Sequence, residues 1–400
     1  MKLRSISSVK NLKGLRVLVR ADFNVPLAQG QPGEGEDWRL MKTLPTIELL
    51  VKRGARVVLA SHLGRPKKKA ASFKLDPVAR RLSKLLGRKV AKLPDCVGPK
   101  VVKAVAKTKN GDVVLLENLR FHAGEEKNDA KFAKRLAEPA DIYVNDAFAA
   151  CHRKAASLVA VTKHLPSYAG LLLQAEVGAL ERLLEKPARP YIVVMGGAKV
   201  STKLGVIERL LGIADLVLVG GALANPFFKI LGYGIGSSLT SKEDEGAARK
   251  LLKSEHIRKL WLPADMVVGN PKRPSARAEH VLRTIVPSGI CSGKDAILDV
   301  GPRTVSAWSS FLRSAQTIVW NGPLGLFEVP KFSHGTLSLG RLIAARSKGK
   351  AFGVVGGGES VAALARTGLM DCVDHVSTGG GAMLEFLEGR KLPGLEALKQ

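Results

Sequence analysis

The sequence has few cysteines and no long apolar run. The 400-residue chain contains four cysteines, which are far apart and show no CxxC spacing. This argues against a disulfide framework and against a zinc site. No apolar run approaches the roughly 20 residues that a membrane-spanning helix needs. The N-terminus, MKLRSISSVKNLKG, also lacks the apolar stretch of a secretory signal. We therefore expect a soluble cytoplasmic protein that does not bind a membrane.

Aromatic and acidic residues are also scarce. Aromatic residues make up 5% of the chain and do not alternate with its basic runs. Proteins that bind single-stranded nucleic acids stack bases on aromatic side chains, so such a platform is not expected. The 63 basic residues outnumber the 35 acidic ones and give a net charge of +28. A solvated basic surface explains many of the lysines. An anionic small substrate and a nucleic acid are the more specific interpretations.

Hydrophobic residues make up 46% of the chain and occur in short runs along it. A single core stops growing at about 250–300 residues, so two domains are expected. Short β-rich runs alternate with helical patterns, which predicts an α/β fold of parallel sheets with helices on both faces. In the first series, strands are predicted at residues 16–23, 55–61, 112–118 and 141–148, and helices at 41–54 and 75–87. In the second series, strands are predicted at residues 190–197, 215–221, 259–269, 295–301, 316–322 and 351–358.

One amphipathic helical pattern, residues 170–190, separates the two series and ends in prolines. It predicts a connector between an N-terminal domain, residues 1–169, and a C-terminal domain, residues 190–385. We assign residues 170–189 to this connecting helix. The last residues, 386–400, are expected to pack back on the N-terminal domain.

Basic residues in the first series point to an anionic ligand. Parallel sheets bind ligands at the carboxyl ends of their strands, and most of these residues lie at or after predicted strand ends: Arg20, Arg39, His62, Arg65, Arg120, His152 and Arg153. Guanidinium groups bind carboxylates and phosphates with paired hydrogen bonds. Arg20 taken alone is explained better as a surface residue. Asp22 and Asn24 fit hydroxyl recognition, or they cap the turn before Pro26.

Glycine turns in the second series point to phosphate groups. In MGGAKVSTKLGVIERLL, residues 195–211, a helix is predicted to carry Lys199 and Lys203 one turn apart. Its N-terminus could receive a phosphate, although a close-packed glycine turn explains the pattern equally well. The Walker A spacing is absent. Glu328, after another glycine turn, is either a ribose ligand or an exposed acid. Three glycines at residues 379–381 are predicted to form an anion hole for a transferring group.

Nine segments, taken together and in order, resemble the signatures of phosphoglycerate kinases over nearly the whole chain. They are VRADFNVP, LPTI, SHLGRP, LLENLRFH, NDAF, GGAKVSTK, VWNGPLGLFE, VVGGGES and HVSTGGGA. The resemblance implies two Rossmann-like domains joined by a hinge helix, in a monomer. It implies reversible phosphoryl transfer from 1,3-bisphosphoglycerate to ADP, giving 3-phosphoglycerate and ATP, with Mg²⁺ as cofactor. It also pairs Glu176 with a position such as His375 to couple the hinge.

The same resemblance implies the site residues. The phosphoglycerate would be bound by Asp22, Phe23, Asn24, Arg39, His62, Leu63, Gly64, Arg65, Arg120 and Arg153. The nucleotide would be bound by Gly197, Lys199, Lys203, Gly220, Gly221, Ile297, Asn321, Pro323, Glu328, Gly357, Gly358, Glu359 and Ser360. Arg39, Lys203, Gly380 and Gly381 would act in catalysis, and Glu359 would hold the metal ion.

The chain departs from the family pattern at several positions. Ala149 replaces a glycine, and Ala155 stands where a second histidine is common. Ile297 replaces a glycine in many members, and Glu359 stands where Asp is usual. The segment before Arg39, residues 28–38, is long.

Three other functions fit the sequence less well. A dinucleotide-dependent oxidoreductase needs a GxGxxG turn, and GYGIGSS at residues 232–238 has the wrong spacing. The net charge motivates a nucleic-acid-binding or moonlighting protein on a kinase fold. An inactive, degenerate kinase is disfavoured because Arg39, Lys203 and the glycine turns are retained.

Overall fold

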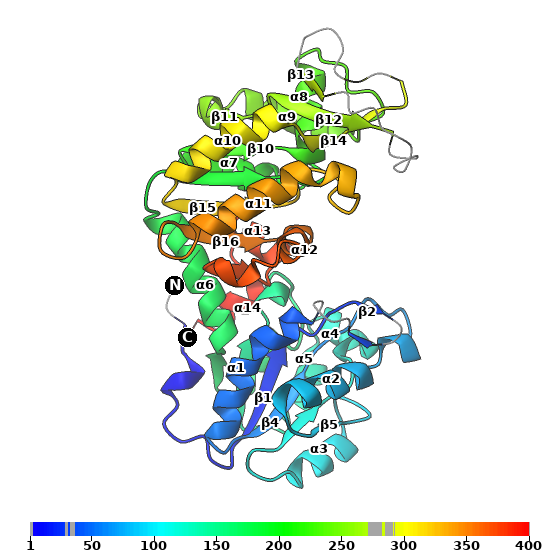
Figure 1. Ribbon diagram of the computed structural model, residues 1–400. Helices are drawn as coiled ribbons and strands as arrows, with labels where there is room; N and C mark the ends of the chain where they lie inside the picture. The colour runs from blue at the N-terminus through cyan, green and yellow to red at the C-terminus, as the bar shows by residue number, and fades with distance from the viewer. Residues whose placement is uncertain are drawn as a thin grey trace. The chain divides into compact units, whose positions relative to one another are not determined.

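The computed structural model describes residues 3–28, 31–32, 37–270, 282–284, 291 and 293–399. The chain divides into two compact units, which are described separately (Figure 1). Unit 1 contains Met1–Gly178 and Lys391–Gln400, and unit 2 contains Ala179–Arg390. Among the described residues, no helix has the length and apolar character needed to cross a membrane.

Unit 1 is built on a six-stranded parallel sheet of order β5-β6-β4-β1-β7-β8. Its strands are β1 (Arg16–Ala21), β4 (Arg56–Ala60), β5 (Val90–Lys92), β6 (Val113–Leu115), β7 (Ile142–Asp146) and β8 (Ser167–Ala169). A short antiparallel pair joins β2 (Leu27–Ala28) and β3 (Gln31–Pro32). Successive side chains of β1, such as Leu18 and Val19, point to opposite faces and are both fully buried. The sheet is therefore covered on both faces, as predicted.

The helices of unit 1 follow the strands at the intervals that a parallel sheet requires. They are α1 (Trp38–Lys52), α2 (Asp76–Leu86), α3 (Pro99–Ala106), α4 (Ala123–Glu126), α5 (Ala130–Ala137) and α14 (Pro393–Glu396). Ile47 of α1 and Leu82 of α2 join Val19 and Leu59 in one hydrophobic core. Helix α2 ends at Gly87, whose φ of 62° is a left-handed conformation that glycine adopts without strain.

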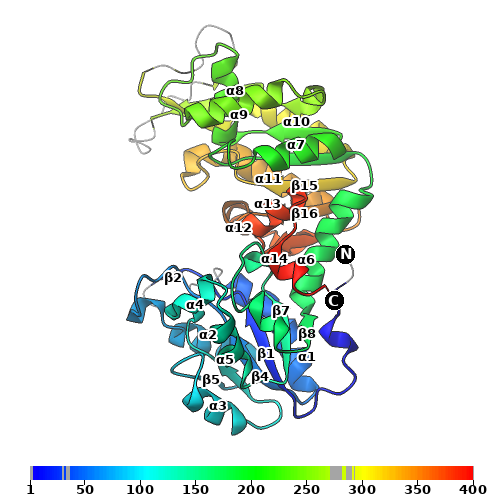
Figure 2. The same ribbon diagram turned by 180° about the vertical axis from the view of Figure 1, so that it is seen from behind.

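Unit 2 contains a second six-stranded parallel sheet, of order β11-β10-β9-β15-β16-β17 (Figure 2). Its strands are β9 (Tyr191–Met195), β10 (Leu216–Val219), β11 (Leu260–Trp261), β15 (Thr317–Asn321), β16 (Phe352–Gly356) and β17 (His375–Ser377). Its helices are α7 (Leu204–Ile213), α8 (Asn225–Ile230), α9 (Lys242–Leu252), α10 (Pro302–Ser314), α11 (His334–Arg346), α12 (Gly358–Ala365) and α13 (Gly381–Glu388).

One predicted strand of the second series, residues 295–301, and half of another, residues 259–269, do not belong to the parallel sheet. Residues 259–269 split at Pro263 into β11 and β12 (Asp265–Gly269). Strand β12 pairs antiparallel with β13 (Leu282–Thr284) and β14 (Ala296–Val300) in a separate three-stranded sheet. A buried apolar run has the same sequence pattern in either kind of sheet, so periodicity could not distinguish them.

Helix α6 (Leu171–Glu185) contains the division between the units, which falls after Gly178. The domain boundaries predicted at residues 169 and 190 therefore stay a prediction. The last part of the chain belongs to unit 1, where the Gly394 backbone N–H donates to the Cys151 carbonyl over 2.9 Å.

Candidate active site

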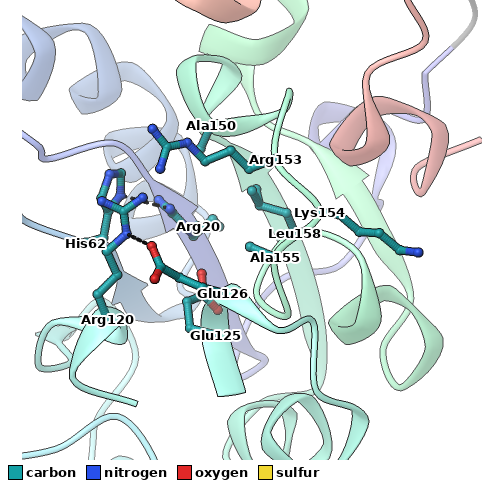
Figure 3. Close-up of a pocket in the computed structure, with 10 residues that line it drawn as sticks. All are labelled: Arg20, His62, Arg120, Glu125, Glu126, Ala150, Arg153, Lys154, Ala155 and Leu158. Carbon is teal, nitrogen blue, oxygen red and sulfur yellow. Dashed lines mark hydrogen bonds and ion pairs between the residues drawn. The ribbon is translucent and has the colours of Figure 1, made fainter. Parts of the chain in front are cut away.

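A basic cavity of about 210 Å³ lies at the carboxyl end of the unit 1 sheet (Figure 3). It is lined by Arg20, His62, Arg120, Glu125, Glu126, Ala150, Arg153, Lys154, Ala155 and Leu158. Arg20 comes from β1, and His62 follows β4. Arg120 lies in a short 3₁₀ turn after β6 (Leu119–Phe121), and Arg153 follows β7. The parallel strands thus bring together four of the seven basic residues singled out in the sequence, although these four are far apart along the chain.

Arg20 is the residue whose position the sequence misjudged. It is only 2% exposed and lines the cavity rather than the surface. Its Nε donates to Ser157 Oγ over 3.0 Å, and its Nη2 lies 3.1 Å from His62 Nδ1. A buried arginine needs such partners. Its position inside an apolar strand was the feature of the sequence that could have indicated its burial.

His62 is buried among these guanidinium groups. Burial lowers its pKa well below 6.5, and the positive charges of Arg20, Arg120, Arg153 and Arg39 lower it further. The imidazole is therefore neutral at neutral pH, which lets it approach the guanidinium groups without repulsion.

Asp22, Asn24 and Arg39 form a second part of this edge. Arg39 lies in the first turn of α1, and its Nη1 donates to Asp22 Oδ2 over 3.0 Å. The Arg39 side chain is 22% exposed, so the guanidinium can still meet a ligand. Asn24 Oδ1 accepts a hydrogen bond from the Gly64 N–H over 2.8 Å. Gly64 has a φ of +62°, and a Cβ there would lie 2.4 Å from the Phe73 ring.

The remaining predicted residues of unit 1 differ in exposure. Asn24, Leu63 and Gly64 line a neighbouring hollow of about 370 Å³. Phe23 is fully buried in the core, and its backbone N–H donates to Ser61 Oγ. Arg65 is exposed and lines neither hollow. Its long side chain would therefore reach a ligand only from outside the cavity.

A larger, more apolar cavity of about 320 Å³ lies in unit 2. Of the residues predicted to bind a nucleotide, it is lined by Gly197, Gly221, Ile297, Pro323, Glu328 and Glu359. Ala222, Ala296, Leu298 and Leu326 supply apolar walls. A mostly apolar cavity with a few polar groups, here two carboxylates and glycine backbone, is typical of a small-molecule site. Gly220, the other predicted adenosine residue, packs against Leu324 beside this cavity.

Two glycine loops touch through their backbones at the edge of this cavity. The Gly197 N–H donates to the Pro323 carbonyl over 3.0 Å, and the Gly196 N–H donates to the Asn321 carbonyl over 2.9 Å. A Cβ on Gly196 would lie 2.0 Å from the Pro323 oxygen. Gly197 itself has a φ of +110°. The glycines are therefore required by loop packing, and they also leave backbone groups open to a ligand.

Lys203 lies against these loops. Its Nζ donates to the Gly196 carbonyl over 2.7 Å and to Asn321 Oδ1 over 2.9 Å. Burial lowers its pKa to about 8, and the Glu359 carboxylate acts in the opposite direction. Lys199 is exposed. The prediction that both lysines lie on a helix is wrong, because α7 begins at Leu204 and Lys203 is the residue before it. Gly197 has a positive φ, and the chain after it forms turns before α7 begins at Leu204.

The segment containing Gly357, Gly358, Glu359 and Ser360 forms the start of α12. Gly357 has a φ of +93°. Ser360 is fully buried, and its Oγ accepts a hydrogen bond from the Gly322 N–H over 2.5 Å. Asn321 Nδ2 donates to the Gly356 carbonyl over 2.9 Å. Asn321 and Ser360 therefore hold these loops together, while Glu359 is exposed and lines the cavity.

Gly380 and Gly381 begin α13, as predicted from the glycine run. Gly380 has a φ of 52°, and a Cβ on either residue would meet no other atom within 4 Å. The open space at this helix start is compatible with an incoming phosphoryl group.

Glu359 is one of two acidic side chains, with Glu328, that line the unit 2 cavity. Mg²⁺ is usually held by one or two carboxylates and otherwise by substrate phosphates and water. An exposed carboxylate beside Lys203 at the cavity edge meets this requirement. In the described part of the chain, the one group of three potential ligands is Asp95, Cys96 and His122, in unit 1. There His122 Nε2 already lies 2.6 Å from Asp95 Oδ1, and Lys69 pairs with the same carboxylate.

Comparisons with known proteins agree on one family. The family description "Phosphoglycerate kinase" matches residues 6–390. Phosphoglycerate kinase of Moorella thermoacetica is 48% identical over 392 residues, covering 97% of each chain. The protein of the same name from Rubrobacter xylanophilus is 48% identical over 401 residues, covering 100% of this chain and 99% of its own.

Solved structures are similar over the same length. Phosphoglycerate kinase from Coxiella burnetii superposes with a TM-score of 0.84 at 40% identity, covering 100% of this chain and 99% of its own. The enzyme from Pyrococcus horikoshii superposes with a TM-score of 0.86 at 34% identity, covering 99% of this chain and 98% of its own.

Proposed function

The chain belongs to the phosphoglycerate kinase family, and we propose how its two cavities perform the reaction of that family. The enzyme transfers a phosphoryl group reversibly between 1,3-bisphosphoglycerate and ADP, with a carboxyl group as the acceptor in the reverse direction. The residue roles below are inferred from the geometry of each unit.

The basic cavity of unit 1 is the proposed phosphoglycerate site, and its convergent charge is the observation that carries the proposal. Arg120 and Arg153 would bind the phosphate or carboxylate group of the substrate. Arg20, not chosen from the sequence, would join them. Neutral His62 would donate or accept one hydrogen bond without adding charge. Asp22 and Asn24 would bind the hydroxyl group.

The apolar cavity of unit 2 is the proposed nucleotide site. Ile297, Gly221 and Pro323 would contact the adenine, and Glu328 would accept ribose hydroxyl groups. Lys203 would neutralise phosphate charge, and the phosphates would in turn hold its proton. Lys199 is exposed and free to add a second charge.

Glu359 is the proposed metal ligand. When bound, Mg²⁺ would neutralise the nucleotide phosphates and orient the transferring group. Glu is one methylene longer than the Asp that is usual in the family. The exposed start of α12 gives this longer side chain room to adjust.

The chemical step needs positioning and charge neutralisation rather than a protein nucleophile. In the reverse direction, a carboxylate oxygen of 3-phosphoglycerate attacks the γ-phosphorus of ATP. The new P–O bond forms as the bond to the β–γ bridging oxygen breaks and ADP leaves. We propose that Arg39, Lys203 and the backbone N–H groups of Gly380 and Gly381 stabilise the charge of the moving group.

The two ligands bind on separate units in this proposal, so transfer requires the units to close on each other. A cytoplasmic location and a monomeric state remain proposals. The nucleic-acid alternative rests on the net charge of +28 alone, and nothing in the comparisons favours it.

The direct test is a coupled assay with ATP, Mg²⁺ and 3-phosphoglycerate that follows acyl-phosphate formation. Turnover is expected, and folded protein without turnover would overturn the function. Arg39→Ala and Lys203→Ala should each lose at least about a hundredfold in kcat, as expected for groups that stabilise the transition state. Arg65→Lys, an exposed change that keeps the charge, is the control and should lose much less. Equal losses in all three variants would mean that the roles are assigned wrongly.

A further inference from the structure

The cavity of unit 1 contains an acidic side chain that the reaction does not call for. Glu126, the last residue of α4, lines the cavity together with the arginines (Figure 3). Its Oε1 lies 3.2 Å from Arg120 Nε. A carboxylate beside the arginine proposed to bind an anionic substrate is in the place where a competing anion would lie.

Glu126 differs from its neighbour Glu125 in its surroundings. Glu125 is 2% exposed, and its two oxygens accept hydrogen bonds from Ser157 Oγ over 2.6 Å and from Ser157 N over 3.0 Å. It is therefore part of the frame that holds Arg20. The Glu126 side chain is 65% exposed and pairs with Arg120. One acid is fixed in the structure, and the other can move away.

The Arg120–Glu126 pair affects the balance of charge in the cavity. The Arg120 side chain is only 7% exposed, and its Nη1 donates to the Gly64 carbonyl over 2.5 Å. Burial lowers the Arg120 pKa, and the positive charges of Arg153, Arg20 and Arg65 lower it further, while Glu126 raises it. Glu126 thus offsets the repulsion among the arginines while no substrate is present.

We propose that Glu126 is an internal anion that occupies Arg120 in the free enzyme and sets the affinity of this cavity for phosphoglycerate by competing with it. The inference rests on the proposed function, because it requires the substrate to bind at Arg120. The substrate brings more negative charge than one carboxylate and displaces Glu126 into solvent. The enzyme therefore binds its substrate less tightly than the same arginines could.

The size of the effect follows from the exposure of the pair. Ion pairs with one exposed partner contribute modestly, so removing the Glu126 charge should tighten substrate binding by about two- to fivefold. Glu126→Gln keeps the size of the side chain and removes its charge. Glu126→Asp keeps the charge on a shorter side chain and should show a smaller gain.

The experiment is calorimetric titration of 3-phosphoglycerate into the full-length protein, without nucleotide, at low salt. Glu138→Gln is the matched control, because Glu138 is an exposed acid of the same unit that does not line the cavity. The Kd of Glu126→Gln should fall about two- to fivefold, and the Kd of Glu138→Gln should not change. An unchanged or raised Kd in Glu126→Gln would overturn the proposal. Absence of binding to the unmodified protein would instead overturn the proposed function, and this inference with it.

Further measurements distinguish competition for Arg120 from a purely structural role of Glu126. In an Arg120→Ala background, Glu126→Gln should no longer tighten substrate binding, because Glu126 then has no Arg120 guanidinium group to occupy. The gain in affinity should also shrink as salt rises to about 0.5 M, where exposed charges are screened. In steady-state assays the KM for 3-phosphoglycerate should fall by a larger factor than kcat changes. If Glu126→Gln still tightened substrate binding in the absence of Arg120, Glu126 would not act through Arg120, and the proposal would be wrong.

Discussion

Burial is the main cause of the shifted pKa values of His62, Lys203 and Asp299. His62 and Lys203 belong to the two proposed ligand sites. Asp299 lies in β14 and is 1% exposed, with its Oδ2 accepting the Gly335 N–H over 2.7 Å. Such groups link the protonation state of single residues to ligand binding and stability.

Asp299 should make stability depend on pH. Burial raises its pKa to about 7, although hydrogen bonds from the backbone of Gly335, Val300 and Thr336 act in the opposite direction. The folded protein therefore holds this proton between about pH 4 and 7, where an unfolded Asp has lost it. The resulting stability is present below about pH 4 and is lost as pH rises through 7. Asp299→Asn removes this dependence.

The measurement is the thermal midpoint of both proteins between pH 5.5 and 8. The free energy of unfolding of Asp299→Asn minus that of the unmodified protein should rise by up to about 1.4 kcal/mol per pH unit below pH 7 and level off above it. The difference between the two thermal midpoints should become more positive over the same range. Asp146, whose pKa is also raised to about 7, is present in both proteins and cancels in this difference. A difference that does not vary with pH would contradict the assignment.

Glu359 should control the response to Mg²⁺. Glu359→Asp keeps a carboxylate at the start of α12 and should retain Mg²⁺-dependent turnover. Glu359→Ala removes the oxygen ligand and should need about tenfold more Mg²⁺ or more for half-maximal rate. The readout is initial rate against free Mg²⁺ at fixed ATP. An Ala variant with an unchanged Mg²⁺ curve would show that another group holds the metal.

At the scale of elements, the contact between the Gly196–Gly197 and Asn321–Pro323 loops fixes the edge of the proposed nucleotide cavity. Gly196→Ala places a methyl group 2.0 Å from a backbone oxygen, which a flexible side chain cannot relieve. The loops must separate, at a cost of about 1–3 kcal/mol or more. We expect a lower thermal midpoint and at least about tenfold weaker ADP binding.

Gly246→Ala is the matched control for this change. Gly246 is exposed within α9, and a Cβ there meets nothing within 4 Å. Alanine favours the helix by up to about 1 kcal/mol, so this substitution should raise stability and leave ADP binding unchanged. If both alanine variants bound ADP equally well, the loop contact would not shape the cavity.

The sequence predicted most of the longer strands, together with the three-residue β6 inside residues 112–118, and missed several short ones. The apolar runs of β1, β4, β7, β9 and β15 were sufficient to place these strands. Strands β5, β8 and β17 have three residues each, too few for a period to appear. The antiparallel position of β12 depends on its pairing with β14, which no local pattern records. His62, Arg120 and Arg153 were predicted from their places near strand ends, and all three line the basic cavity. The burial of Arg20 and the pairing of Glu126 with Arg120 required the folded geometry.

At the scale of the whole molecule, the proposed mechanism requires the two units to close when both ligands are bound. Small-angle scattering should show a smaller radius of gyration with a nucleotide and 3-phosphoglycerate together than with either alone. Glu176→Ala tests the predicted hinge coupling and should weaken this change and lower kcat. Unmodified protein whose radius is the same in all ligand states would contradict closure. A Glu176→Ala enzyme with normal closure and kinetics would exclude that residue from it.

The position of residues 391–400 in unit 1 affects the order in which the two units are synthesised. Residues 391–400 complete unit 1, whereas unit 2 is one uninterrupted stretch, Ala179–Arg390. In topological terms, unit 2 is an insertion within unit 1. All of unit 2 is therefore synthesised between two parts of unit 1, and the segment that packs on Cys151 follows it. Residues that meet in unit 1 are thus separated along the chain by the whole of unit 2.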